Sequence, residues 1–137
     1  MPERIQRRRM RGWRLPDGSR CVTRPGAFAN PFKILKPVRG GGRSWRVIWT
    51  GRGPGFHDAA PAGFEPVKVA TQGEAQAAAA QLFRAWLARP EQAGLRARVQ
   101  AELRGVDLAC YCPAGMPCHA DALIELASQG PAPAPVS

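Results

Sequence analysis

The sequence predicts a small single-domain protein of the α/β or α+β class, a sandwich with a short mixed sheet and three helices in the C-terminal half. A chain of 137 residues is of single-domain size. Short apolar stretches between turn formers dominate its first half, and segments of helical periodicity dominate its second. We expect an Arg-rich N-terminal arm (1–16), a globular domain (17–129) and a disordered Pro/Ala tail (130–137).

The first half predicts strands. Residues 20–24 form a candidate first strand, which a Pro-Gly pair ends. Residues 33–38 and 44–50 predict a hairpin around a run of three glycines. A long loop at 51–63 contains His57, and loops of this length are typical of binding loops or lids.

The second half predicts helices. Thr71 and Glu74 form a capping box, and apolar residues follow at helical spacing as far as Trp86. Pro90 ends this helix and suits the first position of the next one, which ends before Gly105. A buried strand and a last amphipathic helix are then expected over 106–112 and 120–128.

The basic charge lies in one half of the chain. Residues 1–52 carry 14 Lys/Arg and 2 acidic residues, whereas residues 53–137 carry 6 and 8. This asymmetry favours a polyanionic partner or a phosphorylated ligand, and the alternative is a solvated face of an Arg-rich protein. The candidates for nucleic-acid contacts in the arm are Arg4, Arg7, Arg8, Arg9, Arg11 and Trp13. We expect removal of residues 1–14 to leave the fold intact, because they contain little apolar surface.

Composition also bears on location. No apolar run is long enough to span a bilayer, and no apolar stretch follows the basic N-terminus, so we expect neither a membrane span nor a secretory signal. Cysteines clustered toward the C-terminus then favour reduced thiols and a cytoplasmic location. A disulfide framework is the weaker alternative.

Three of the four cysteines and one of the two histidines lie within residues 110–119. This segment joins the expected strand 106–112 to the expected helix 120–128. Pro117 suits the first helical position, which would place Cys118 and His119 in the first turn. There the helix dipole favours a thiolate.

Three interpretations of these residues compete. In the first, zinc is the cofactor and Cys110, Cys112, Cys118 and His119 bind it, although the C-x-C-x5-C-H spacing departs from common zinc motifs. In the second, Cys118 is a reactive thiolate or His119 a general base, which Asp121 orients. In the third, the cysteines are small buried hydrophobic residues.

An anion site can form at the same place. If the strand that ends at Arg24 pairs with the strand that ends at Cys112, both end at one edge of the sheet. Arg24 and Asn30 would then lie near His119, within the ~10 Å that a nucleotide-sized ligand spans, and would bind its phosphate. Phe32 would stack on a base.

The motifs resemble a known family. Residues 103–112, followed by Pro-Cys-His-Ala-Asp from Pro117, are similar to the signature of the bacterial and phage family called domain of unknown function 4326. Tyr111 stands where that family usually has tryptophan. An earlier Arg-Pro and the Asn-Pro-Phe at 30–32 also match, so the resemblance covers roughly residues 3–128. It implies a fold and a site, but the family has no established activity.

The leading hypothesis is a protein, enzyme or sensor, that binds or processes a nucleotide or other phosphorylated ligand in this pocket. The pocket residues would be Arg24, Asn30, Cys110, Cys112, Cys118 and His119. The alternative is a non-catalytic nucleic-acid-binding module with a structural Cys/His zinc site.

Overall fold

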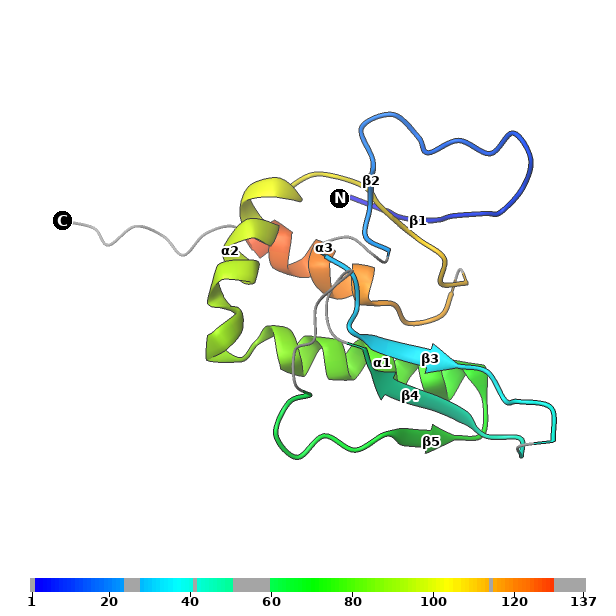
Figure 1. The fold of residues 1–137 in the computed structure, drawn as a ribbon. Coiled ribbons are helices and arrows are strands. Elements are labelled where there is room, and N and C mark those ends of the chain that lie inside the picture. Colours follow the sequence, from blue (N-terminus) through cyan, green and yellow to red (C-terminus); the bar gives the residue numbers. More distant parts are fainter. Residues whose placement is uncertain (1, 24–27, 41, 51–59, 114, 130–137) are drawn as a thin grey trace.

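The computed structural model describes residues 2–23, 28–40, 42–50, 60–113 and 115–129. A parallel and an antiparallel three-stranded sheet and three α-helices build the fold (Figure 1). The α/β class and the three helices are therefore confirmed, and the strands expected to share one mixed sheet form two sheets. In the described part of the chain, no helix is long and apolar enough to cross a membrane.

The parallel sheet has the order β1 (Arg4–Gln6), β6 (Leu108–Cys110), β2 (Arg20–Cys21). All three residues of the central strand β6 are buried. Both outer strands run parallel to it, so the chain leaves β2 and β6 at the same edge of the sheet. This is the strand pairing on which the expected anion site depended.

Strand β1 differs from the expected arm, because residues 4–6 belong to the sheet. Ile5 pairs with Ala109, and main-chain hydrogen bonds extend the pairing at both ends. The N–H of Leu108 donates to the carbonyl of Glu3 (3.1 Å), and the N–H of Arg7 donates to that of Cys110 (2.6 Å). The residues between β1 and β2 form a loop that extends away from the rest of the fold (Figure 1).

The antiparallel sheet has the order β3 (Phe32–Leu35), β4 (Trp45–Trp49), β5 (Val67–Val69). The expected hairpin is confirmed, with Val47 of β4 opposite Ile34 of β3. Strand β5 was not expected, since three residues with a central lysine give only a weak alternating pattern.

The helices are α1 (Gln72–Leu87), the short 3-10 helix η1 (Pro90–Gln92), α2 (Ala93–Glu102) and α3 (His119–Gln129). The hydroxyl of Thr71 accepts from the N–H of Glu74 at 3.1 Å, so the expected cap of α1 is confirmed. Pro90 begins η1 rather than an α-helix.

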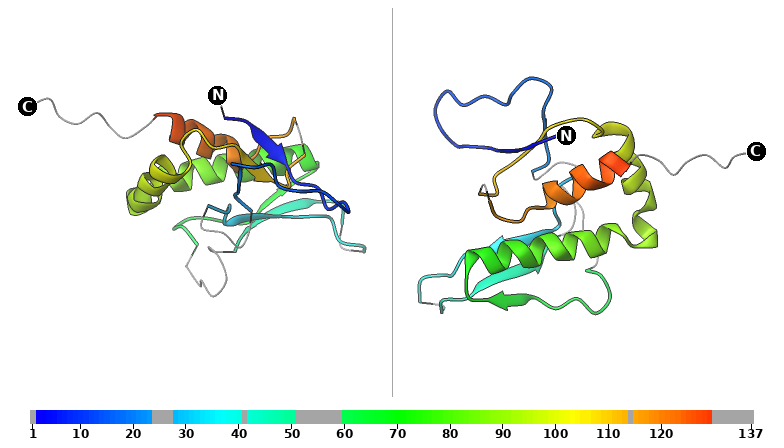
Figure 2. Two further views of the ribbon diagram at one scale, coloured as in Figure 1. Left: turned by 90° about the horizontal axis from the view of Figure 1, so that it is seen from above. Right: turned by 180° about the vertical axis from the view of Figure 1, so that it is seen from behind.

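Helix α1 packs against all three strands of the antiparallel sheet, and α3 packs against α1, α2 and β6 (Figure 2). The α1–α3 pair therefore links the two sheets. The largest fully buried side chains are found along this path, and they include Phe83, Leu103, Leu108 and Leu123. The start of α3 is thereby held beside the end of β6.

Some expectations lie outside the described residues. These are Arg24, His57 and the tail 130–137.

Candidate functional site

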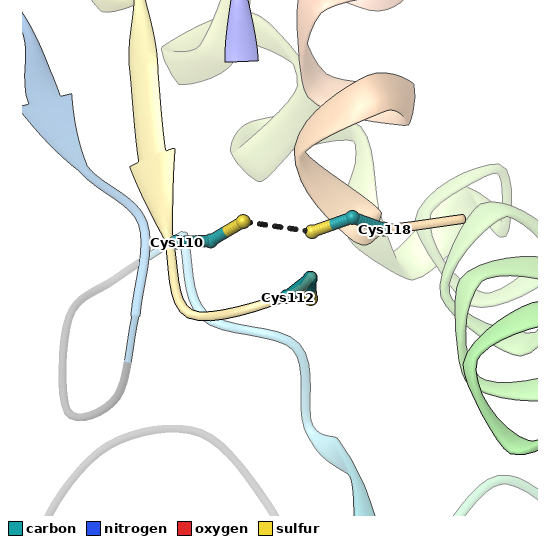
Figure 3. A group of neighbouring side chains, drawn as sticks. All are labelled: Cys110, Cys112 and Cys118. Atoms are coloured by element: carbon teal, nitrogen blue, oxygen red, sulfur yellow. Dashed lines mark hydrogen bonds between the residues drawn. The ribbon is translucent and has the colours of Figure 1, made fainter. Parts of the chain in front are cut away.

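Three thiols converge where β6 ends and α3 begins. Cys110 is the last residue of β6, Cys118 directly precedes α3, and Cys112 lies in the segment between them (Figure 3). The sulfur atoms all lie within 4.8 Å of one another, and the Sγ atoms of Cys110 and Cys118 are 3.0 Å apart. Cys110 and Cys118 are buried, with exposed fractions of 1% and 3%. Cys112 lies beyond the strand, yet its thiol joins the other two, as the zinc interpretation of the sequence requires.

The turn after β6 brings Cys118 back to the strand. Gly115 has φ +83°, a backbone conformation that favours glycine, and the N–H of Met116 donates to the carbonyl of Pro113 at 3.2 Å. Helix α3 begins at His119, so Pro117 stands before the helix and Cys118 is its N-cap residue. This corrects the expectation that Pro117 is the first helical residue. The shift places the Cys118 sulfur beside the free N–H groups of the first turn.

Asp121 caps this helix. Its Oδ2 accepts from the N–H of Cys118 at 3.2 Å, and its own N–H donates to the carbonyl of Cys118 at 3.1 Å. The same oxygen lies 3.3 Å from Nη1 of Arg4. The carboxylate is thus engaged by Cys118 and Arg4, and no hydrogen bond within the described residues joins it to His119. The expected orientation of His119 by Asp121 is not seen.

Electrostatics favour one thiolate in the cluster. Hydrogen bonds from the thiols of Cys112 and Cys118 lower the pKa of Cys110, and the charge of Arg4 acts in the same direction. The pKa of Cys112 is raised, because its thiol hydrogen-bonds to Cys110 and is partly desolvated. Cys118 Sγ also accepts from the N–H of Ala120 at 3.5 Å. The arrangement can therefore hold a negative charge on sulfur in a largely buried place.

Arg4 is a site residue that sequence reasoning assigned to nucleic acid. Its Nη1 donates to the carbonyl of Met116 at 2.6 Å and its Nη2 to that of Pro113 at 3.3 Å. Burial opposes its charge, yet the carboxylate of Asp121 and the thiols of Cys118 and Cys110 together raise the pKa of Arg4. Only 15% of its side chain is exposed. The guanidinium holds the turn between β6 and α3 and is not available to a phosphate backbone.

His119 is buried, with 7% exposed. Its Nε2 lies 2.8 Å from the carbonyl oxygen of Val22, and its ring contacts the Phe83 ring edge-on at 5.2 Å. A carbonyl only accepts, so Nε2 carries the proton and Nδ1, 3.6 Å from Cys118 Sγ, presents a lone pair. With both nitrogens engaged, the geometry does not support the expected role of His119 as a general base toward a ligand.

A cavity of about 300 Å³ opens beside the thiols. Six residues predicted for the site line it: Asn30, Phe32, Cys110, Cys112, Cys118 and His119. Asp121 does not line it, and Arg24 lies outside the described residues. Sequence reasoning missed the cavity residues Lys33, Gln76 and Tyr111, and it placed Arg9 with nucleic acid.

Two of the predicted binding residues have structural roles. The Asn30 amide donates to the carbonyl of Ala79 at 3.2 Å and accepts from the N–H of Phe32 at 2.9 Å. Phe32 is 3% exposed and packs edge-on against Trp49 and Phe64, with ring centroids 5.3 Å apart in each pair. The Phe32 ring thus belongs to the core, and it also lines the cavity, so its stacking on a base stays a prediction.

The family model for a domain of unknown function, DUF4326, matches residues 5–129. The chain belongs to the DUF4326 family. No curated protein and no solved structure matches it. The matched range of this DUF4326 domain begins in β1 and ends with α3, so it contains both elements that carry the thiols.

The arginines of the DUF4326 N-terminus divide into two groups. Arg7 donates to the hydroxyl of Thr23 at 2.8 Å, and the guanidinium carbons of Arg7 and Arg9 each lie 4.6 Å from the centre of the Tyr111 ring. The second group consists of Arg8, Arg11 and Arg14, which are exposed, and Trp13 between them is half-buried.

The sequence contains a signal that could have identified Gln76 as a cavity residue. Gln76 is a polar residue on the apolar face of a helix that is otherwise rich in alanine.

Proposed function

We propose that this protein binds a phosphorylated small molecule of nucleotide size in the cavity beside the three thiols. The observation that carries the proposal is the charge of the lining. Arg9 and Lys33 line the cavity, and none of the described residues that line it is Asp or Glu. A cavity lined by cations without carboxylates favours an anion, and its volume is at the lower end of the range typical of ligand sites.

The side-chain amide of Gln76 supports the same proposal. Gln76 is 8% exposed and lines the cavity, and within the described residues its side chain makes no hydrogen bond. Its amide atoms are open to the cavity, where a ligand can replace water as their partner. An amide both donates and accepts, which suits a base edge, a sugar hydroxyl or a phosphate oxygen.

The residues divide between the two ends of such a ligand. Arg9 is exposed and Lys33 is exposed on strand β3, so each can contact a phosphate from the mouth of the cavity. Tyr111 also lines the cavity, and the Arg9 guanidinium lies over its ring, so Tyr111 positions this cation at the cavity. Cys110, Cys118 and Gln76 are buried lining residues, so they would contact the inner end of the ligand.

Thermal-shift and calorimetric titrations of the full chain would test the proposal with nucleoside monophosphates, the matching nucleosides and inorganic phosphate. We expect nucleotides to bind more tightly than nucleosides. Lys33→Gln should weaken nucleotide binding about tenfold, near 1.4 kcal/mol. The matched control is Lys36→Gln, because Lys36 is exposed outside the cavity lining.

A second variant separates binding from folding. Gln76→Leu should weaken nucleotide binding without lowering the midpoint of thermal unfolding, since no described residue hydrogen-bonds to the amide that is lost. Equal binding of nucleotides and nucleosides, or equal effects of Lys33→Gln and Lys36→Gln, would contradict the proposal.

A second candidate function is binding of nucleic acid through the loop between β1 and β2. The specific observation that favours it is the exposure of Arg8, Arg11 and Arg14 on a loop that extends from the fold. Such side chains can contact a phosphate backbone without any change in the fold.

A further inference from the structure

We infer that Cys110, Cys112 and Cys118 bind a zinc ion whose fourth coordination position opens into the cavity. The inference is independent of the ligand proposed above, because it rests on the thiols, their surroundings and the place of the cavity, and not on the cations of the lining. Figure 3 shows the side chains of Cys110 and Cys118 pointing toward each other between β6 and the start of α3, with Cys112 beside them.

The spacing of the sulfurs fits one metal ion. Around tetrahedral zinc with Zn–S bonds of about 2.3 Å, the sulfurs lie about 3.8 Å apart. The three sulfurs lie within 4.8 Å of one another. The Cys110 and Cys118 sulfurs, 3.0 Å apart, need to separate by less than about 1 Å to admit the ion. Three thiolates are also the ligands that zinc prefers over the hard cations magnesium and calcium.

The surroundings of the thiols suit a metal centre. Three thiolates and one Zn²⁺ carry a net charge of −1, and the Arg4 guanidinium interacts electrostatically with both Cys118 and Cys110. The N–H of Ala120 donates to Cys118 Sγ, and Asp121 holds the Cys118 backbone. Such outer contacts orient the ligands of a metal site and neutralise its charge.

The geometry favours three protein ligands rather than four. His119 is outside the group of mutually close ligand atoms, although its Nδ1 is 3.6 Å from Cys118 Sγ. Its Nε2–H is held by the carbonyl of Val22, which fixes the ring away from a position shared with all three sulfurs. This differs from the Cys3His set that the sequence suggests.

The open position follows from the cavity. All three cysteines line it, so a fourth ligand can reach the ion from that side without moving a protein element. Structural zinc sites are closed by four protein ligands, whereas three protein ligands and an open position are typical of zinc that binds water or substrate. The site would therefore take an oxygen ligand, either water or an anion, from the cavity.

The first test is metal content and cobalt spectroscopy on the reduced full chain. Protein purified without chelator should contain about one zinc per chain. Cobalt added to the metal-free protein should give thiolate-to-cobalt charge-transfer bands and the visible bands of tetrahedral cobalt. Cys112→Ser should weaken cobalt binding by more than the ~100-fold that loss of an outer contact can cost. Cys21→Ser is the matched control, because Cys21 is a free cysteine on β2 outside the cluster and should bind cobalt normally.

The second test addresses the open position. Inorganic phosphate or azide should shift the visible bands of the cobalt protein, and His119→Gln should leave the intensity of the charge-transfer bands unchanged. Absence of zinc together with absence of cobalt bands in wild-type protein would overturn the site. Loss of metal in Cys21→Ser would overturn the ligand assignment, and loss of the bands in His119→Gln would show a closed site. None of these measurements includes a nucleotide, so failure of the metal site and failure of the proposed function are distinguishable.

Discussion

The imidazole Nε2 of His119 donates a hydrogen bond to the main-chain carbonyl of Val22 across 2.8 Å. This bond joins the first residue of α3 to the residue directly after β2, which lie 97 positions apart in the sequence. Both residues are buried, and Val22 has no exposed surface. His119 therefore holds the start of α3 against the parallel sheet.

This bond predicts a large effect of His119→Ala on stability. The change removes the hydrogen bond and the contact with Phe83, and it leaves a space in the core. We expect a loss of about 2–3 kcal/mol in the free energy of unfolding, measured by urea denaturation. His119→Gln is the control, since it keeps a side-chain N–H donor and should cost less. An unchanged denaturation midpoint in His119→Ala would show that the bond is not formed in solution.

Arg4→Ala should also destabilise the fold. The change leaves the carbonyls of Met116 and Pro113 without their guanidinium donors. The lost ion pair with Asp121 contributes little to the free energy of unfolding, because the Asp121 side chain is 43% exposed. We expect a loss of about 1–2 kcal/mol in thermal or urea unfolding. Arg11→Ala, at an exposed position, should change stability by less than about 0.5 kcal/mol. Similar effects of the two variants would contradict the assignment of Arg4 to the turn.

Binding of nucleic acid should depend on the exposed arginines of the loop. The triple change Arg8→Ala, Arg11→Ala and Arg14→Ala should reduce the slope of log K against log salt by about 2–3, because each contact with B-DNA contributes about 0.9. Fluorescence anisotropy with a labelled duplex at several salt concentrations would measure it. Full-length protein that ignores DNA and RNA at low salt would exclude this second function. Deletion of residues 1–14 is not a suitable test. It removes strand β1 and should therefore unfold the parallel sheet, contrary to the expectation that the fold would stay intact.

Replacement of two glycines by alanine should change the free energy of unfolding in opposite directions. Gly105 has φ +71° after α2, so Gly105→Ala should cost about 1 kcal/mol in urea unfolding. Gly94 lies inside α2 and is not among the glycines of positive φ, so Gly94→Ala should stabilise by about 0.5–1 kcal/mol. A Cβ added at either position meets no atom within 4 Å, so neither effect includes a steric clash. Stability changes in the same direction for both variants would show that backbone conformation at the two glycines does not determine the effect of alanine.

The features that the sequence predicts well depend on neighbouring residues. The Thr71–Glu74 cap and the apolar spacing that follows act within one or two turns of α1, so the pattern identifies this helix. The clustering of three cysteines within residues 110–118 is likewise visible in the chain. In the structure, the turn after β6 returns Cys118 to Cys110, with their sulfurs 3.0 Å apart.

The features that the sequence does not predict depend on distant residues. Strand β1 contains a single apolar residue, Ile5, and its stability comes from main-chain hydrogen bonds to β6 more than 100 positions away. Arg4 resembles the other arginines of the N-terminus until that pairing sets it beside the turn that carries Met116. Lys33 and Gln76 belong to different elements that meet only at the cavity.

The sequence by itself determined the α/β class, the helices with strong periodicity and the position of the thiol cluster, because short-range contacts along the chain specify them. Only the tertiary structure decided which polar groups are free to act. Burial and long-range hydrogen bonds engage Arg4, Asn30 and His119 in the fold and leave Gln76 without a partner among the described residues. The free energy of a polar side chain depends on the partners that folding brings to it, and residue type and spacing do not specify those partners.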